Sequence, residues 1–139
     1  MATKTNAVRL VQQAGIPCRE AFYEFDEQDL SGVHAAQAIG MPEEQVFKTL
    51  VARGEKTGIN VFCIPVCCEL DLKKAAKAAG DKNMELVAVK ELLGLTGYIR
   101  GGCSPVGMKK HYPTFIDETC TLWDEIAVSA GARGHQMIV

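Results

Sequence analysis

The apolar positions near the N-terminus recur with the period of a helix. Residues 5–14 place their apolar side chains on one helical stripe, with Thr5 as the candidate N-cap and Gly15 and Pro17 shortly after the last turn. A second helix is predicted from about Ser31 to Ile39 and is closed by Gly40. The chain is therefore expected to begin with two short helices.

The middle of the chain predicts two strands and then a helix. The segment "VFKTLVA" at 46–52 alternates with the period of a strand, and both of its faces are largely apolar. The segment "INVFCIPV" at 59–66 is typical of a strand that is buried on both sides. The clearest helix is "ELDLKKAAKAAG" at 69–80, with Asp71 as N-cap and Gly80 as C-cap.

Strand signals dominate the second half of the chain. Short apolar or alternating segments are separated by Gly, Pro and charged residues, and they read "MELVAV" (84–89), "GYIRG" (97–101), "PTFIDE" (113–118), "DEIAVSA" (124–130) and "HQMIV" (135–139). Together with the earlier elements this gives about six or seven strands and about four short helices. We expect an α/β (α+β) fold in which a curled, barrel-like mixed sheet carries helices on its outside.

Composition bounds the class of protein. The 139 residues are 47% hydrophobic and 23% charged, which suits a single domain over 1–139 that buries roughly 70% of its unfolded surface. No apolar run approaches the ~20 residues that span a bilayer, and the N-terminus shows no apolar signal segment. The six cysteines lack disulfide or zinc spacing, so we expect a reduced, cytoplasmic protein without metal or cofactor. The net charge of −2 argues against coating of nucleic acid but permits one local phosphate contact.

Lys48 is unusual for its position, because it shares a predicted strand face with Val46 and Leu50. One interpretation is an edge-strand lysine that reaches solvent and discourages strand pairing. The other is an ammonium group inside a cavity, where it would meet an anion or a carbonyl oxygen. The sequence leaves both interpretations open.

A glycine-rich loop, "RGGCSPVGMKKH" at 100–111, follows the predicted strand at 97–101. Glycines in such a loop permit positive φ and let a ligand approach the backbone, whose N–H groups stay exposed. The loop matches neither a phosphate-binding P-loop nor a dinucleotide fingerprint. When the loop is taken alone, an ordinary turn with Pro105 at a corner explains it better than a ligand site.

The combination of motifs resembles a known family. The segments "VFKTLVA", "LDLKKAAKAAG", "LTGYIRGGCSPVGMKK" and "VSAGARG" are similar, in this order, to the YbaK/EbsC family of free-standing aminoacyl-tRNA editing domains. That family is similar in turn to the editing insertion of prolyl-tRNA synthetases. The resemblance extends from about Ala7 to Gly134. It implies deacylation of mischarged tRNA, typically Cys-tRNA(Pro), by a curled mixed sheet that holds the aminoacyl end.

The resemblance also implies roles for particular residues. The family's essential lysine corresponds to Lys48, and its glycine-to-proline loop corresponds to Gly101–Pro105, which implies catalytic roles for Lys48 and Gly101. The implied substrate-binding residues are Tyr23, Ser31, Gly102, Cys103, Ser104, Pro105 and Ser129. Two positions depart from the family pattern, because Ser31 replaces a phenylalanine and Gln136 replaces an acidic residue. The Ser31 departure predicts a roomier or more polar amino-acid site, and both departures leave room for the removal of alanine or another small residue.

The implied chemistry agrees with the local physics. Loop N–H groups from Gly101 to Cys103 can polarise an ester carbonyl. Lys48 can anchor the terminal phosphate or sugar, or stabilise the negative charge that develops in the reaction. In this family the substrate's own thiol attacks the ester, so Cys103 is not expected to be a nucleophile. Lys109 and Lys110 follow the loop and are candidates for tRNA phosphate contact.

Several alternatives stay open at this point. The amino acid removed is cysteine, alanine or serine, and the chain acts alone or docks on prolyl- or cysteinyl-tRNA synthetase. A tRNA-binding or protein-binding module without catalysis is the alternative from a different functional class.

Overall fold

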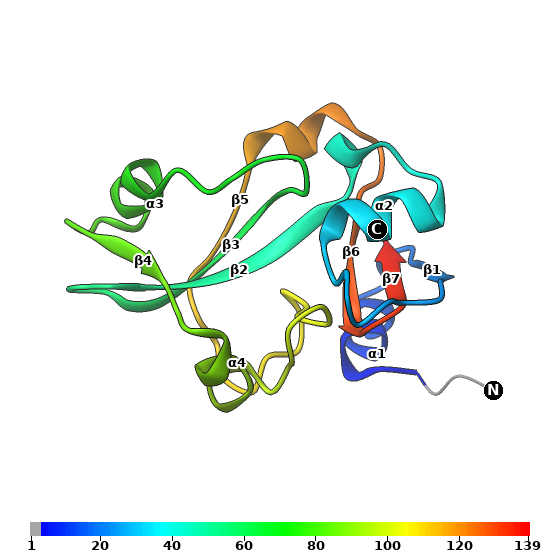
Figure 1. Ribbon diagram of the computed structural model, residues 1–139, viewed down its shortest axis with the longest axis horizontal. Helices are drawn as coiled ribbons and strands as arrows, with labels where there is room; N and C mark the ends of the chain where they lie inside the picture. Colours follow the sequence, from blue (N-terminus) through cyan, green and yellow to red (C-terminus); the bar gives the residue numbers. More distant parts are fainter. Residues whose placement is uncertain (1–3) are drawn as a thin grey trace.

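The computed structural model describes residues 4–139 (Figure 1). The N-terminal helix α1 spans Asn6–Gln13, and its cap is the Thr5 hydroxyl, which accepts a hydrogen bond from the Val8 N–H. The strand β1 follows at Arg19–Phe22. Helix α1 buries Ala7, Val8 and Val11, so the stripe read from the sequence is its core-facing side.

The first of two sheets has three strands in the order β1-β7-β6. Strand β6 (Ala127–Ala132) and strand β7 (His135–Ile138) form an antiparallel hairpin, and β1 adds to the other edge of β7. The register pairs Ser129 with Gln136 and then shifts before Ala132. This irregularity turns the chain at the end of the hairpin that lies nearest the glycine-rich loop.

The second sheet has four strands in the order β4-β2-β3-β5. Strands β2 (Phe47–Gly54) and β3 (Gly58–Pro65) form a long antiparallel hairpin, and β4 (Met84–Leu86) pairs with the distal end of β2. Strand β5 (Thr114–Ile116) runs parallel to β3. At Lys48, β2 therefore pairs with β3 along one edge. The opposite edge of β2 pairs with β4 only at residues 52–54 and is free at Lys48.

The helices lie outside the sheets, and α2 and α3 are capped by the residues that the sequence indicates. Helix α2 (Gly32–Ile39) has Ser31 as N-cap and Gly40 in the left-handed region. Helix α3 (Leu72–Ala79) packs Ala75 and Ala76 against the four-stranded sheet, between the Asp71 and Gly80 caps. The remaining helices are α4 (Val89–Thr96), η1 (Glu43–Gln45) and η2 (Glu118–Leu122).

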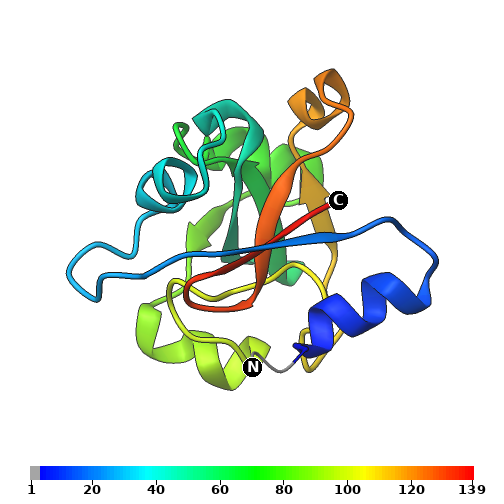
Figure 2. The same ribbon diagram turned by 90° about the vertical axis from the view of Figure 1, so that its right-hand side faces the viewer.

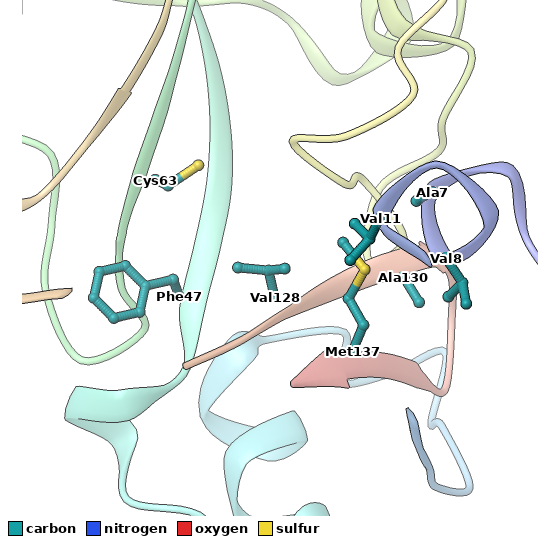
Figure 3. Packing of buried hydrophobic residues seen from close by; sticks show 8 residues of the cluster. All are labelled: Ala7, Val8, Val11, Phe47, Cys63, Val128, Ala130 and Met137. Carbon is teal, nitrogen blue, oxygen red and sulfur yellow. The ribbon is translucent and has the colours of Figure 1, made fainter. Parts of the chain in front are cut away.

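One buried cluster joins the two sheets. Figure 3 shows its side chains, which come from α1, β2, β3, β6 and β7: Ala7, Val8, Val11, Phe47, Cys63, Val128, Ala130 and Met137. Burial of a valine, phenylalanine or methionine contributes about 1.5–3 kcal/mol each. An isolated parallel bridge between Val46 and Ala127 fixes β2 beside β6. This junction places Lys48 and Ser129 on the same side of the molecule.

The structure corrects two expectations about the fold. The barrel-like closure is wrong, because the strands form two separate sheets, one behind the other (Figure 2), that meet at a single bridge. The strand expected at 97–101 is also wrong, because Gly97 ends α4 in the left-handed region and the following residues form a turn. The mixed α/β class and the helices on the outside are confirmed.

Candidate functional site

A cavity of about 410 Å³ opens where the two sheets meet. Its walls come from the segment after β1, the start of α2, the first half of β2, the segment from β4 into α4, and the glycine-rich loop. Side chains of β6 and β7 complete it. Six of the residues implied by the family resemblance line this cavity: Tyr23, Ser31, Lys48, Gly101, Cys103 and Ser129.

Lys48 lies in the cavity wall between Phe47 and Thr49. It is half-buried, and its cross-strand partner in β3 is Ile64. No salt bridge within residues 4–139 includes Lys48. The ammonium group therefore has no carboxylate partner in the described structure and is free to meet a ligand.

The charges around the cavity have one sign. Arg100 is the second cation in the lining, and no aspartate or glutamate belongs to the lining that the described residues form. A concave site with low-dielectric walls concentrates the field of its charges. The cavity is thus suited to a ligand that carries negative charge, such as a phosphodiester.

The glycine-rich loop is held close to the β6–β7 turn. Gly101 has φ +85°, and a methyl group at this position would lie 3.2 Å from the Leu30 side chain. A Cβ at Gly102 would lie 3.0 Å from the Arg133 backbone nitrogen, and the Arg133 Nε donates to the Arg100 carbonyl at 2.9 Å. These close approaches require glycine at both positions and fix the backbone of the loop.

The loop offers fewer N–H donors than the sequence predicts. The Gly102 N–H donates to the Ile99 carbonyl at 3.0 Å, and Gly102 does not line the cavity. The N–H groups of Gly101 and Cys103 have no backbone acceptor among the described residues, and both residues line the cavity. Any polarisation of a carbonyl by this loop would come from those two groups.

Cys103 has the character of a buried thiol. Burial raises its pKa to about 11, against a hydrogen bond from Thr96 that lowers it. The thiolate is therefore scarce near neutral pH, which does not favour nucleophilic attack by this residue. Ser104 is fully buried outside the cavity, where its hydroxyl accepts from the Val106 N–H, and the half-buried Pro105 also lies outside the lining.

Ser31 lines the cavity, but its hydroxyl is already engaged. It accepts from the His34 N–H at 3.2 Å as the cap of α2 and donates to the Asp29 carboxylate at 2.6 Å. The hydrogen bonds from Ser31 lower the pKa of Asp29. A serine in place of an aromatic residue fills less of the cavity at this position. Its hydroxyl caps α2 and binds Asp29, so it is not available to a ligand.

Ser129 and Gln136 face each other across the β6–β7 hairpin and both line the cavity. The Ser129 hydroxyl accepts from the Gly131 N–H at 3.1 Å. Gln136 is 6% exposed, and its Oε1 is buried without a hydrogen-bond partner among the described residues. A buried amide oxygen without a partner costs about 1–3 kcal/mol, which a bound donor would offset.

The remaining predicted residues are Tyr23, which lines the cavity, and two lysines, which do not. Tyr23 follows β1, where its N–H donates to the Gly134 carbonyl, and its ring lies 6.3 Å from that of His34. Lys109 and Lys110 are exposed and do not line the cavity. Among residues 4–139 no three His, Cys, Asp or Glu side chains gather as a metal site requires. In the same range no helix has the length and apolarity needed to cross a membrane.

Two functional candidates are missing from the set predicted from the sequence. Arg100 was treated as part of a strand, and only the position of the loop beside the cavity brings it into the lining. Gln136 was noted only as a departure from the family pattern. Gln136 pairs with Ser129 in the register of the β6–β7 hairpin, so its side chain lies on the same face as that of Ser129. Counting the alternation of side chains along the two strands from the sequence could have placed Gln136 beside Ser129.

The structure is that of a small α/β domain with a cavity at the junction of two sheets, and, among residues 4–139, both charged residues in the lining of this cavity are cations. The model of the aminoacyl-tRNA editing domain matches residues 30–139, and the chain belongs to this family. A protein of Enterococcus faecalis, EbsC, provisionally named a Cys-tRNA(Pro)/Cys-tRNA(Cys) deacylase, is 48% identical over 96% of this chain and 82% of its own length.

The chain is also similar to a second curated protein and to a solved structure. The uncharacterised protein YwhH of Bacillus subtilis is 24% identical over 79% of this chain and 69% of its own length. A solved structure described provisionally as a trans-editing enzyme for prolyl-tRNA synthetase superposes with a TM-score of 0.81 at 26% identity. The match covers 99% of this chain and 88% of that structure.

Proposed function

We propose that this chain removes a wrongly attached small amino acid from tRNA in trans, with Cys-tRNA(Pro) as the leading substrate. The observation that carries the proposal is the cavity, which combines two cations, two free loop N–H groups and an unpartnered amide oxygen. An aminoacyl-tRNA 3′ end offers the complementary groups, namely a phosphodiester, an ester carbonyl and an α-amino group. The name of the Enterococcus faecalis relative supports the choice of cysteine.

The residues divide the work as follows. Lys48 and Arg100 attract the terminal phosphate, and Lys48 also stabilises the negative charge that develops at the ester. The N–H groups of Gly101 and Cys103 polarise the ester carbonyl. The Gln136 Oε1 accepts a hydrogen bond from the α-amino group of the substrate.

With a cysteinyl ester, the nucleophile belongs to the substrate. The cysteine Sγ forms a bond to the carbonyl carbon, and the bond from that carbon to the tRNA 3′ oxygen breaks. The electron pair stays on the 3′ oxygen, which takes up the proton lost by the thiol. The products are the free tRNA and a cyclic thioester, so this route is a lyase reaction. Alanyl or seryl esters would need water, and their removal would be hydrolysis.

An editing site on a separate protein adds to the amino-acid selectivity of the synthetase that charges the tRNA. One synthetase pocket separates amino acids that differ by a single small group by only ~10–200-fold, and a separate editing site supplies the remaining selectivity. Charged tRNA is a cytoplasmic substrate, so we place the activity in the cytoplasm. Docking on prolyl- or cysteinyl-tRNA synthetase would deliver that substrate, and a pull-down with either synthetase tests it.

The test is a panel of tRNAs charged with different amino acids. Purified protein is mixed with Cys-tRNA(Pro), Ala-tRNA(Pro), Ser-tRNA(Pro), Cys-tRNA(Cys) and correctly charged Pro-tRNA(Pro), and the loss of ester is followed against spontaneous hydrolysis. The proposal expects the fastest loss for a cysteinyl ester and none above background for the prolyl ester. Binding of the tRNAs without turnover of any ester would contradict it and support the non-catalytic module.

A further inference from the structure

Two adjacent cysteines lie in the turn that follows β3. The Cys67 and Cys68 sulfur atoms are 3.9 Å apart, and both residues are exposed. The turn is closed by the Cys68 N–H, which donates to the Pro65 carbonyl at 3.0 Å. Each of the other four cysteines is at least partly buried: Cys18, Cys63, Cys103 and Cys120. Cys67 and Cys68 are thus both accessible to a reagent, and each lies close to a second thiol.

We propose that Cys67 and Cys68 form a reversible redox site, which low-molecular-weight disulfides close to an intrachain disulfide. The thiolate of one cysteine attacks a sulfur of the small disulfide and releases one small thiol. The second cysteine then attacks the mixed disulfide on the protein and releases the other small thiol. The two cysteines lose two electrons and two protons in total, and the small disulfide is reduced to two thiols.

Proximity, and not acidity, makes this pair reactive. Local desolvation, the neighbouring Cys68 and the Glu44 carboxylate raise the pKa of the exposed Cys67, so its thiolate is not abundant at neutral pH. The second thiol, however, already lies beside the sulfur where a mixed disulfide would form. Ring closure between adjacent residues is strained, and strained or exposed disulfides are the easily reduced ones. The disulfide therefore forms only with an excess of oxidant and is readily reduced back to two thiols.

The turn is connected to the wall of the cavity through Val66. The Val66 N–H donates to the Val46 carbonyl at 2.8 Å. Val66 also packs so closely on Gly32 that a Cβ at position 32 would clash with the Val66 Cγ1. Val66, Val46 and Gly32 all line the cavity. Closing the disulfide changes the backbone of the turn that holds Val66, so oxidation alters this part of the wall.

The first measurement is mass mapping of the full chain after exposure to glutathione disulfide. In the wild type, the peptide that contains both cysteines should lose the mass of two hydrogens, carry no glutathione, and return to its reduced mass with dithiothreitol. The variants Cys67→Ser and Cys68→Ser should each retain one glutathione on the remaining cysteine. Cys120→Ser is the matched control and should behave as the wild type. Two glutathiones per chain, a disulfide-linked dimer, or no reaction would overturn the proposal.

The second measurement tests the connection to the cavity by NMR. Oxidation of the wild type should shift the methyl signals of Val66 and the amide signal of Gly32. The double variant Cys67→Ser/Cys68→Ser can hold neither the disulfide nor a glutathione at this turn, so the same oxidant should leave both signals in place. The spectrum of the reduced variant reports whether its fold is intact. A wild-type chain that forms the disulfide without a shift at Val66 would overturn the inferred effect on the wall. Neither measurement depends on deacylation, so the proposed function is tested separately.

Discussion

Replacing Lys48 by alanine removes the cation that the proposed mechanism needs most. The ammonium group lines the cavity and has no salt-bridge partner among the described residues, so its charge is available to the substrate. Two unit charges about 4 Å apart interact by about 4 kcal/mol at an effective dielectric constant near 20. Arg100 stays in the cavity and compensates part of that loss.

The expected effect of Lys48→Ala is therefore a loss of about 3 kcal/mol in transition-state stabilisation, which is on the order of a hundredfold in rate. The assay is the single-turnover loss of cysteine from Cys-tRNA(Pro), with Lys74→Ala on the exposed surface of α3 as the matched control. Stability should change little, within about 0.5 kcal/mol, since no ion pair is broken. A Lys48→Ala variant that deacylates at the wild-type rate, or that loses activity only by unfolding, refutes this reasoning.

Four further variants test the other parts of the site and the fold. Gly101→Ala forces a Cβ onto a residue with φ +85° and against Leu30, so deacylation should fall on the order of a hundredfold while circular dichroism stays native. Cys103→Ala should keep most of the single-turnover rate, and inactivity in a folded variant would make Cys103 the nucleophile. Gln136→Leu should raise KM about tenfold through one lost hydrogen bond, and an unchanged KM would exclude this contact. Although desolvation raises the pKa of Asp81, hydrogen bonds from Thr57, Lys56 and Lys82 outweigh it and hold that pKa well below its usual value. Its contribution to stability is present above about pH 4 and declines as the pH falls toward the lowered folded-state pKa, so Asp81→Asn should lower the Tm at pH 7 more than at pH 3.

The elements that could be predicted from the sequence are those with local signals. The helix at Leu72–Ala79 has an N-cap aspartate and a C-cap glycine at its ends, and the structure shows both in those roles. Strands β2 and β3 follow from two apolar runs that are long enough to identify alone, and the structure shows that they pair as a hairpin. In both cases the residues that decide the structure are neighbours along the chain.

The elements that were missed depend on distant contacts. Residues 97–101 have strand-like composition, but Gly97 ends α4 and the Tyr98 hydroxyl donates to the Val106 carbonyl, which commits the segment to a turn. Strand β1 has four mostly exposed residues and exists because it pairs with β7, more than a hundred positions away. The strands divide into two sheets that are connected by the isolated bridge between Val46 and Ala127. The hydrophobic periodicity of the sequence does not indicate which strands belong to which sheet.

The same distinction applies to the site. Lys48 was identified because a charge on an apolar strand face is unusual, and the structure places it in the cavity wall. Gly102 was assigned a donor role, yet its N–H closes a turn with Ile99, a detail of backbone geometry that composition does not encode. Arg100 and Gln136 reach the cavity only through the packing of the loop against the β6–β7 hairpin.

The most direct measurement is the initial rate at which the wild-type chain releases cysteine from Cys-tRNA(Pro), compared with spontaneous hydrolysis and with the Lys48→Ala variant under the same conditions. An editing deacylase built on this cavity should release cysteine well above the spontaneous rate, and Lys48→Ala should bring that rate down by on the order of a hundredfold. A wild-type rate equal to spontaneous hydrolysis for cysteinyl, alanyl and seryl esters alike, in a protein that is folded and binds tRNA, would contradict the proposed function.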